Sequence, residues 1–466
     1  MHLARVRLPT LASQCGLLRR AEGGDFMRGV RLLVLGVIWS GSFFLILDRV
    51  NISLAAPRIM DELKFDGTQM GFILSIYYWG YLLGHFSSGL VSDQIRLRSF
   101  TSVMILLWSA LTALTGACSA LWHFAVVRLL FGICEGATAN LTHKLQNNWL
   151  LPAERGKAYG IFIGFAYLGI AIGMPLVGWI INAWEWRWMF VAVGLLTLIQ
   201  LALFAVIIRD HPSEHPWLPE PEKVKFREDL RMAQAGLGDH GDPTVIMPFR
   251  QRMATLASIR SFWLLSISAF FGIGVYFTGM SWLPGYLVKE RGITILSSGF
   301  FLTIPYLAAF AGMFIGGGLG DRFGNRSLIS LIAGVLTFPA LLAMAESESV
   351  FMTITMMSVA LFLNSAAVNG FVVLVFDLIP TQVFGTAIGI VGGLCGGLAG
   401  IIGPLLLGYL YDQTGTFFWG FVTLGAGAMI GGLILIPVIA EEKRLKQEKV
   451  ARQALTSGAA VGVTGQ

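Results

Sequence analysis

The segment RLLVLGVIWSGSFFLILDRVNISLAAP, residues 31–57, is an apolar run that the charged pair Asp48 and Arg49 interrupts. A helix of about 20 apolar residues crosses the hydrocarbon core of a bilayer. A charge at that depth costs on the order of 2.5–3.5 kcal/mol, so charged residues there usually face a bundle interior or a water-filled path. The segment therefore predicts a helical membrane protein with a polar site inside it.

A second apolar segment, near residues 122–148, carries charge of both signs. Arg128 and Glu135 both lie in its motif RLLFGICEGA. Together with Asp48 and Arg49 they make two acids and two bases, whose formal charges cancel. This balance is expected of buried charges that neutralise one another.

The composition extends the membrane interpretation to the whole chain. Of its 466 residues, 55% are hydrophobic and only 13% are charged, whereas soluble domains usually carry about 25% charged residues. Apolar runs of span length recur twelve times, and the predicted fold is an all-α polytopic membrane protein. The predicted spans are 31–57, 69–91, 101–121, 123–147, 157–183, 188–208, 262–287, 297–319, 327–345, 350–376, 384–411 and 417–440.

The placement of basic residues predicts the orientation. With both termini in the cytoplasm, 26 of the 33 Lys and Arg residues fall on the inner side and five on the outer side. Cytoplasmic loops carry such an excess. We therefore expect a multi-pass protein of the bacterial inner (plasma) membrane. The net charge of +6 reflects this topology, so no nucleic-acid partner is expected.

Enzymatic and metal-binding patterns are absent from the sequence. The four cysteines form no CxxC pair, and the seven histidines show no HExxH or paired ligand spacing, so neither a disulfide framework nor a metal site is predicted. A membrane enzyme would need a nucleophile or a metal cluster near the interface. We expect neither an enzyme nor a cofactor.

The two halves of the chain repeat. Gly89 and Asp93 recur 228 positions later as Gly317 and Asp321, and glycines of the fifth span recur in the eleventh at offsets of 229 and 230. Internal repeats of this kind indicate a transporter whose halves move about a central site. The predicted organisation is a disordered basic tail (1–27), a six-helix bundle (28–208), a cytoplasmic linker (209–260), a second six-helix bundle (261–440) and a cytoplasmic tail (441–466).

Several motifs match a known family. They are LDRVNISLAAP (47–57), RLLFGICEG (128–136), WLPGYL (282–287), GPLLLGYLYDQTG (403–415) and the pattern G-x-x-x-D-R-x-G-x-R that begins at Gly317. With twelve spans in two repeats, the chain resembles the major facilitator superfamily and, within it, the anion:cation symporters. The resemblance implies a secondary active transporter that imports a small organic anion, such as a sugar acid or an aromatic acid, by proton symport.

The resemblance also implies residue roles. Arg49, Tyr81 and Arg128 fall where the family binds substrate. Asp48 and Glu135 fall where it couples transport to the proton, which is the coupling ion expected here. Arg128 is also the expected structural partner of Asp48.

Departures from the family pattern bear on the substrate. His85 replaces a glutamine that is common one turn after the tyrosine, and the eleventh span has Gly393 and Gly397 where asparagines are common. Fewer groups are then available for hydroxyls, so a less hydroxylated anion fits as well as a sugar acid.

The chemistry of the four charges suggests a cycle. Arginine grips a carboxylate with a planar fork and keeps its proton. We expect Glu135, with Asp48, to take up a proton outside, which frees Arg49 from its carboxylate partner to bind the substrate anion. Proton and anion then leave into the cytoplasm. The alternative is a static cluster of ion pairs that fixes the first span against the fourth.

Three further charges are candidates for gating. Asp93, Asp321 and Arg322 lie at the predicted cytoplasmic mouths of the two halves, where ion pairs between helices can latch one state. The alternative is that these charges only set topology.

Other functions stay open at this point. An organophosphate antiporter is expected to carry an arginine in the seventh span, which has none, and a drug antiporter fits the fifth span only loosely. An anion sensor would keep the same site without moving its ligand. We expect a monomer.

Overall fold

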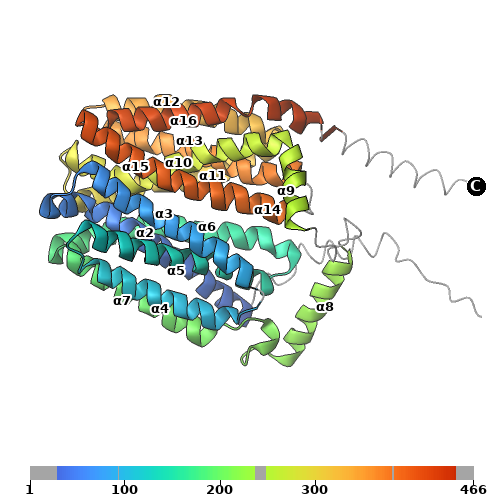
Figure 1. The fold of residues 1–466 in the computed structure, drawn as a ribbon. Coiled ribbons are helices and arrows are strands. Elements are labelled where there is room, and N and C mark those ends of the chain that lie inside the picture. The colour runs from blue at the N-terminus through green and yellow to red at the C-terminus, as the bar shows by residue number, and fades with distance from the viewer. Residues whose placement is uncertain (1–28, 93, 237–247, 380–382, 445, 448–466) are drawn as a thin grey trace, which may run out of the picture.

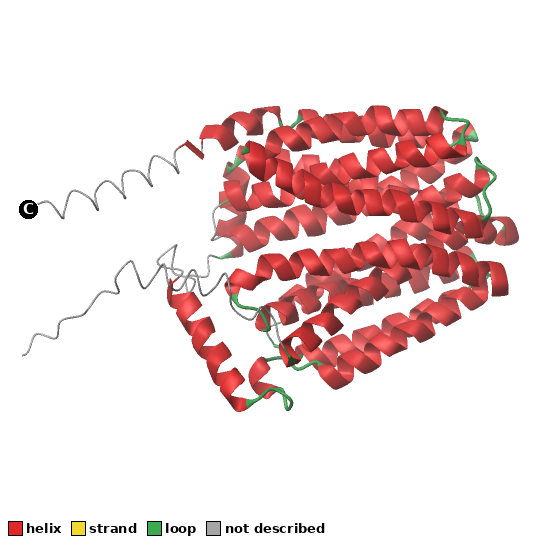
Figure 2. Cartoon of the chain, turned by 180° about the vertical axis from the view of Figure 1, so that it is seen from behind, coloured by secondary structure: helices red, strands yellow, loops and turns green. Residues whose placement is uncertain are grey.

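The computed structural model describes residues 29–92, 94–236, 248–379, 383–444 and 446–447. Every regular element in these ranges is a helix (Figure 2). This agrees with the predicted all-α fold.

The first half of the chain forms six long helices. They are α2 (Val30–Leu63), α3 (Gly67–Val91), α4 (Leu97–Thr115), α5 (Leu121–Asn148), α6 (Arg155–Trp184) and α7 (Trp186–Ile207). They pack mainly on one another, with α3 against α5, α4 against α5 and α7, and α2 against α6 and α7. We call this group the first bundle.

The second half forms the second bundle. Its helices are α10 (Arg260–Lys289), α11 (Ile295–Phe323), α12 (Arg326–Glu346), α13 (Val350–Leu378), α14 (Phe384–Ile388), α15 (Gly396–Thr414) and α16 (Phe418–Leu433). Here α13 packs on α11 and α12, and α10 packs on α13, α15 and α16. Figure 1 shows the two bundles side by side, with helices nearly parallel across them.

The expected span at 384–411 is not one regular helix. A π-helical turn, η4 (Gly389–Cys395), separates α14 from α15. Its sequence GIVGGLC has three glycines and few bulky side chains, which makes the wider turn accessible.

Eleven of the described helices are long and apolar enough to cross a membrane. They correspond to eleven of the twelve predicted spans. The remaining span is α3, whose 25 residues pack between α5 and α15. Large apolar side chains are exposed on the outside of the helices, as on α7 at Trp188, Leu195 and Val206, where a lipid environment accommodates them.

The bundles meet along three helix pairs. These are α3 with α15, α6 with α11, and α2 with α10. Because successive helices alternate in direction, the start of α2 and the end of α16 lie on one face, which we call the termini face. The other face, where α2 ends and α3 begins, is the opposite face.

The segment between the bundles contains two helices, α8 (Glu220–Gly236) and α9 (Phe249–Ser258), which lie on the termini face (Figure 1). The sequence predicted a polar linker at 209–260. The structure adds that α8 contacts the first bundle, since the guanidinium carbon of Arg31 lies 4.7 Å from the centre of the Phe226 ring. The domain boundaries themselves stay a prediction.

Local sequence explains several helix ends. Asp66 caps α3 by accepting a hydrogen bond from the backbone N–H of Gln69, whose side chain bonds back to Asp66, which satisfies two groups at the helix start. Gly324 ends α11 with a φ of 61°, a conformation that glycine adopts without strain.

Candidate functional site

A buried ion pair joins α2 to α5. Nη2 of Arg49 lies 2.5 Å from Oε1 of Glu135, and Nε of Arg49 donates to the same oxygen at 3.1 Å. Arg49 is 8% exposed and Glu135 is fully buried. Desolvating two charges is compensated only when they face each other closely, so each residue depends on the other.

Aromatic rings of α3 and α10 surround this pair. The hydroxyl of Tyr77 donates to Oε1 of Glu135 at 2.8 Å. The guanidinium carbon of Arg49 lies 5.3 Å from the Tyr77 ring, 5.2 Å from the Tyr81 ring and 5.7 Å from the Phe277 ring. Such distances allow cation–π attraction. Because Phe277 comes from α10, both bundles contribute to the site.

Glycines allow α3 to approach α5 closely enough for these contacts. A Cβ atom on Gly80 would lie 2.0 Å from the backbone oxygen of Leu129, and one on Gly136 would lie 2.2 Å from that of Tyr81. Only glycine fits where two helix backbones touch in this way. The motif RLLFGICEG thus supplies both the carboxylate and the close packing that positions it.

Asp48 lies next to Arg49 in sequence but has different partners. Its Oδ2 accepts hydrogen bonds from Nε1 of Trp108 at 2.6 Å and from Oγ1 of Thr197 at 2.8 Å. Its side chain is fully buried. The other carboxylate oxygen, Oδ1, has no partner among the described residues. The side chain of Asp48 therefore extends from α2 toward α4 and α7, inside the first bundle.

The structure differs from the expected pairing of Arg128 with Asp48. In the described part of the chain Arg128 forms no ion pair, and its Nε has no hydrogen-bond partner. Its guanidinium carbon lies 4.7 Å from the Phe131 ring and 5.4 Å from the Tyr77 ring. At 2% exposure, Arg128 is a buried cation held by aromatic faces, whereas Oδ2 of Asp48 accepts from Trp108 and Thr197.

Arg49, Glu135, Tyr81 and Arg128 are therefore brought together around Tyr77, whereas Asp48 bonds to α4 and α7 instead. Tyr77 contacts both Glu135 and the two arginines, and Tyr81 contacts Arg49 from the same helix face. The roles of these residues in binding and coupling remain predictions, which the geometry permits.

The gating candidates are only partly described. Asp93 lies outside the described residues, and so does the side chain of Asp321. Arg322 is exposed in the last turn of α11, at the termini face.

Sequence reasoning did not single out three residues of the site. Tyr77 lies one turn before Tyr81, and that spacing on a helix places both on one face. Trp108 stands in the segment WSALTAL (108–114), and Thr197 has no sequence signal beyond being polar in an apolar helix. In the described residues, no group of three His, Cys, Asp or Glu side chains could hold a metal ion.

The sequence matches one known protein family over most of its length. The sequence model of the Major Facilitator Superfamily matches residues 38–404 and, separately, residues 302–462.

Relatives that are named as transporters match most of the chain. A probable galactarate/D-glucarate transporter, GudP of Bacillus subtilis, is 26% identical over 430 residues, which is 88% of this chain and 92% of that protein. A probable sulfoacetate transporter, SauU of Cupriavidus necator, is 29% identical over 86% of this chain and 92% of its own. A hexuronate transporter of Bacillus subtilis is 28% identical over 84% of this chain and 90% of its own.

Solved structures share the fold at low sequence identity. A bacterial homolog of the human lysosomal transporter Spinster superposes with a TM-score of 0.68 at 16% identity and covers 91% of this chain and 98% of its own. The nucleoside transporter NupG superposes with a TM-score of 0.63 at 14% identity and covers 88% of this chain and 99% of its own.

Proposed function

The chain belongs to the major facilitator superfamily, whose members are transporters and not enzymes, and we propose that it imports a small organic anion by proton symport. The relatives support an organic anion as the substrate class, since they are named as transporters of galactarate and D-glucarate, sulfoacetate and hexuronate. All four carry a carboxylate. Sulfoacetate has no hydroxyl group, so a carboxylate is the shared requirement.

The observation that carries the proposal is the bond between Arg49 and Glu135. Both side chains are buried, and Glu135 accepts from Arg49 and Tyr77 through one oxygen. A proton on Glu135 removes the negative partner of Arg49. The guanidinium then takes the carboxylate of the substrate in its place, which keeps the buried site neutral.

This exchange gives a reason for coupling. With Asp48 ionised and Arg128 charged, the four buried side chains sum to zero when the site is empty and Glu135 is ionised, and the loaded site sums to zero when Glu135 is protonated and the anion is bound. A site that holds the anion without the proton carries an uncompensated charge, which a buried environment disfavours. Proton and anion therefore move together.

Contacts at the opposite face support alternating access. The backbone N–H groups of Gly67 and Thr68, at the start of α3, donate to the carboxylate of Asp412 at the end of α15 at 2.7 and 2.6 Å. Lys289 of α10 pairs with Asp61 of α2. These links hold the two bundles together on one side of the site, and we propose that they separate when that side opens.

The proposed orientation places the termini face in the cytoplasm of a bacterium. The excess of 26 to five basic residues supports this assignment. In that orientation Arg322 lies at the cytoplasmic mouth, next to Asp321 in the chain, and Asp93 follows the end of α3 on the same side by sequence. Their gating role is part of the proposal.

Uptake by purified protein in liposomes tests the function. The probes are labelled D-glucarate, sulfoacetate and benzoate, with glucose 6-phosphate as the organophosphate control. An inward proton gradient should concentrate at least one carboxylate and not the phosphate. We expect Arg49→Lys to lose binding, because lysine lacks the bidentate fork, and Glu135→Gln to lose accumulation while counterflow of labelled probe continues.

The exposed pair of Arg187 and Glu62 provides the matched control. Its atoms approach within 2.7 Å at the opposite face, and both side chains are at least one-third exposed. Arg187→Lys and Glu62→Gln should change uptake little, because exposed pairs contribute about 0–1 kcal/mol. Accumulation by Glu135→Gln under a proton gradient would refute the coupling role. Binding without counterflow in the unmodified protein would favour the anion sensor.

A further inference from the structure

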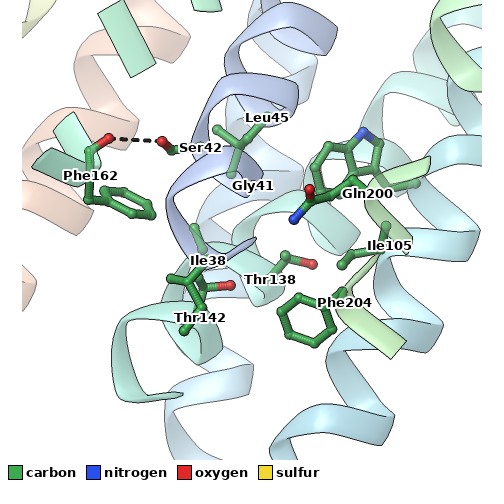
Figure 3. A pocket seen from close by; sticks show the side chains of 12 residues that line it. Ile38, Gly41, Ser42, Leu45, Ile105, Thr138, Thr142, Phe162, Gln200 and Phe204 are labelled. Atoms are coloured by element: carbon green, nitrogen blue, oxygen red, sulfur yellow. Dashed lines mark hydrogen bonds between the residues drawn. The ribbon is translucent and has the colours of Figure 1, made fainter. Parts of the chain in front are cut away.

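A cavity lies inside the first bundle, beside the site and not within it (Figure 3). Five helices contribute to its lining: α2, α4, α5, α6 and α7. Its polar lining residues are Ser42, Trp108, Thr138, Thr142 and Gln200. We call it the side cavity.

The side cavity lies one helical turn from the two carboxylates, toward the termini face. Leu45, which lines it, precedes Asp48 by three residues on α2, and Thr138 follows Glu135 by three on α5. Three residues rise about 4.5 Å along a helix. Because α2 runs away from the termini face and α5 runs toward it, both offsets point the same way.

The side cavity has room for one water molecule, and its mostly apolar wall carries a few polar groups that could hold it. About 20 Å³ is open to the centres of water molecules, and one water needs roughly 10–15 Å³ together with two to four polar partners. The hydroxyl of Thr142 forms no hydrogen bond within the described residues, and the hydroxyls of Ser42 and Thr138 donate to backbone oxygens, which leaves their oxygens free to accept. Figure 3 shows Thr138, Thr142 and Gln200 around the same space.

Trp108 separates this space from Asp48. Its side chain lines the side cavity, and its Nε1 donates to Oδ2 of Asp48. Asp48 is fully buried, and its Oδ1 is unpartnered within the described residues. A buried carboxyl exchanges its proton through water or hydroxyl groups that reach it, and the side cavity lies against the indole that bonds to Asp48.

We infer that the side cavity is a water-binding site that carries protons between Asp48 and the termini face through the first bundle, with Trp108 as its partition. The path does not pass the guanidinium of Arg49. When the indole moves aside, protonated Asp48 gives its proton to a cavity water, which leaves a carboxylate and a hydronium ion. The reverse step loads the carboxyl.

Other ionisable groups lie near this path. On α5 they are Arg128, Glu135 and His143, whose ring centre lies 4.8 Å from that of the lining residue Phe162. On α2 the neighbouring charge is Arg49. The lining residues from α4, α6 and α7 carry no formal charge.

Proton exchange at Asp48 tests the inference without any substrate. Protein in lipid is transferred to D₂O at acidic pH, and infrared difference spectra follow the carboxyl band that Asp48→Asn removes. Replacing Thr138 and Thr142 together by valine keeps side-chain volume and removes two hydroxyls. We expect exchange to slow about tenfold, the rate equivalent of one lost hydrogen bond in the path, and Trp108→Phe to accelerate it.

Thr337→Val is the matched control. Thr337 is buried in the second bundle and donates to the backbone oxygen four residues earlier, as Thr138 does. It should leave exchange at Asp48 unchanged. Equal slowing in this control, no slowing in the double variant, or no band lost in Asp48→Asn would each overturn the inference.

A second measurement does not depend on the variants folding. A structure of the unmodified protein with ordered waters should show water within hydrogen-bonding distance of Thr142 and Gln200, and a dry side cavity would overturn the inference. The inference depends on the proposed function in one respect only, which is that the proton on Asp48 drives transport. Failure of uptake with normal exchange would reject the function and leave the water path standing.

Discussion

Asp412→Asn should loosen the closed opposite face. The carboxylate of Asp412, on α15, accepts from the backbone N–H groups of Gly67 and Thr68 and from the hydroxyl of Thr68. These donors are the start of α3, where a helix favours negative charge. An asparagine keeps one acceptor oxygen, presents an N–H₂ group to the other donors and loses the charge.

The size of the effect follows from these contacts. A hydrogen bond to a charged group contributes about 1.5–3 kcal/mol when shielded, but Asp412 is exposed, so solvent reduces each contribution toward the value of a surface pair. We expect a total loss of about 1–2 kcal/mol from the closed state, which raises the open population about 5–30-fold.

Distance measurements between spin labels test this prediction. Labels at Arg58, on α2, and Thr416, before α16, lie on exposed positions of different bundles at the opposite face. In a cysteine-free background, Asp412→Asn should add a longer distance to the distribution.

Asp66→Asn is the control, because Asp66 caps the same helix from within its own bundle. Asparagine is as good an N-cap as aspartate, and no contact between the bundles changes. If Asp412→Asn leaves the distances unchanged, or if Asp66→Asn lengthens them equally, the carboxylate is not the latch.

Three further predictions address the site, the packing and the termini face. Tyr77→Phe removes the hydroxyl that donates to Glu135 and should slow proton-driven uptake about tenfold, the equivalent of one hydrogen bond; unchanged uptake would separate Tyr77 from coupling. Gly80→Ala forces a Cβ against the backbone of α5 and should lower the thermal midpoint by overpacking worth about 1–3 kcal/mol. Gly160→Ala, where nothing lies within 4 Å, is its control, and an equal loss there would contradict the packing argument. Burial lowers the pKa of His215, so the unfolded chain binds its proton first and the stability from neutral His215 is lost as pH falls below about 6.5. The thermal midpoint should therefore fall more between pH 7.5 and pH 5 in the unmodified protein than in His215→Gln. An equal fall in both proteins would show that His215 does not cause this pH dependence.

The sequence was most informative about charged residues, because a charge inside the lipid bilayer is costly. Charges in an apolar helix are rare enough that Asp48, Arg49, Arg128 and Glu135 could be identified as a group, and the structure places Glu135 against Arg49. Helix number and approximate bounds followed from span length and hydrophobicity. These properties belong to short segments, so no knowledge of distant contacts is needed.

Partner choice inside the bundle could not be predicted in the same way. Arg128 was expected beside Asp48, yet Trp108 and Thr197 bond to that carboxylate while aromatic rings hold Arg128. The contacts of Asp48 exist only once α2, α4 and α7 have met, and α7 approaches α4 closely at Gly194, where a Cβ would lie 2.8 Å from the backbone oxygen of Ser109.

The sequence by itself determined that this is a helical membrane protein with balanced charge at membrane depth, because burial in lipid restricts which residues each span can contain. Only the tertiary structure decided which acid faces which base, that Tyr77 joins them, and that a cavity lies against Trp108, the hydrogen-bond partner of Asp48. Those features depend on how helices turn toward one another, and the hydrophobic pattern of a span that is apolar on nearly every side does not encode that rotation.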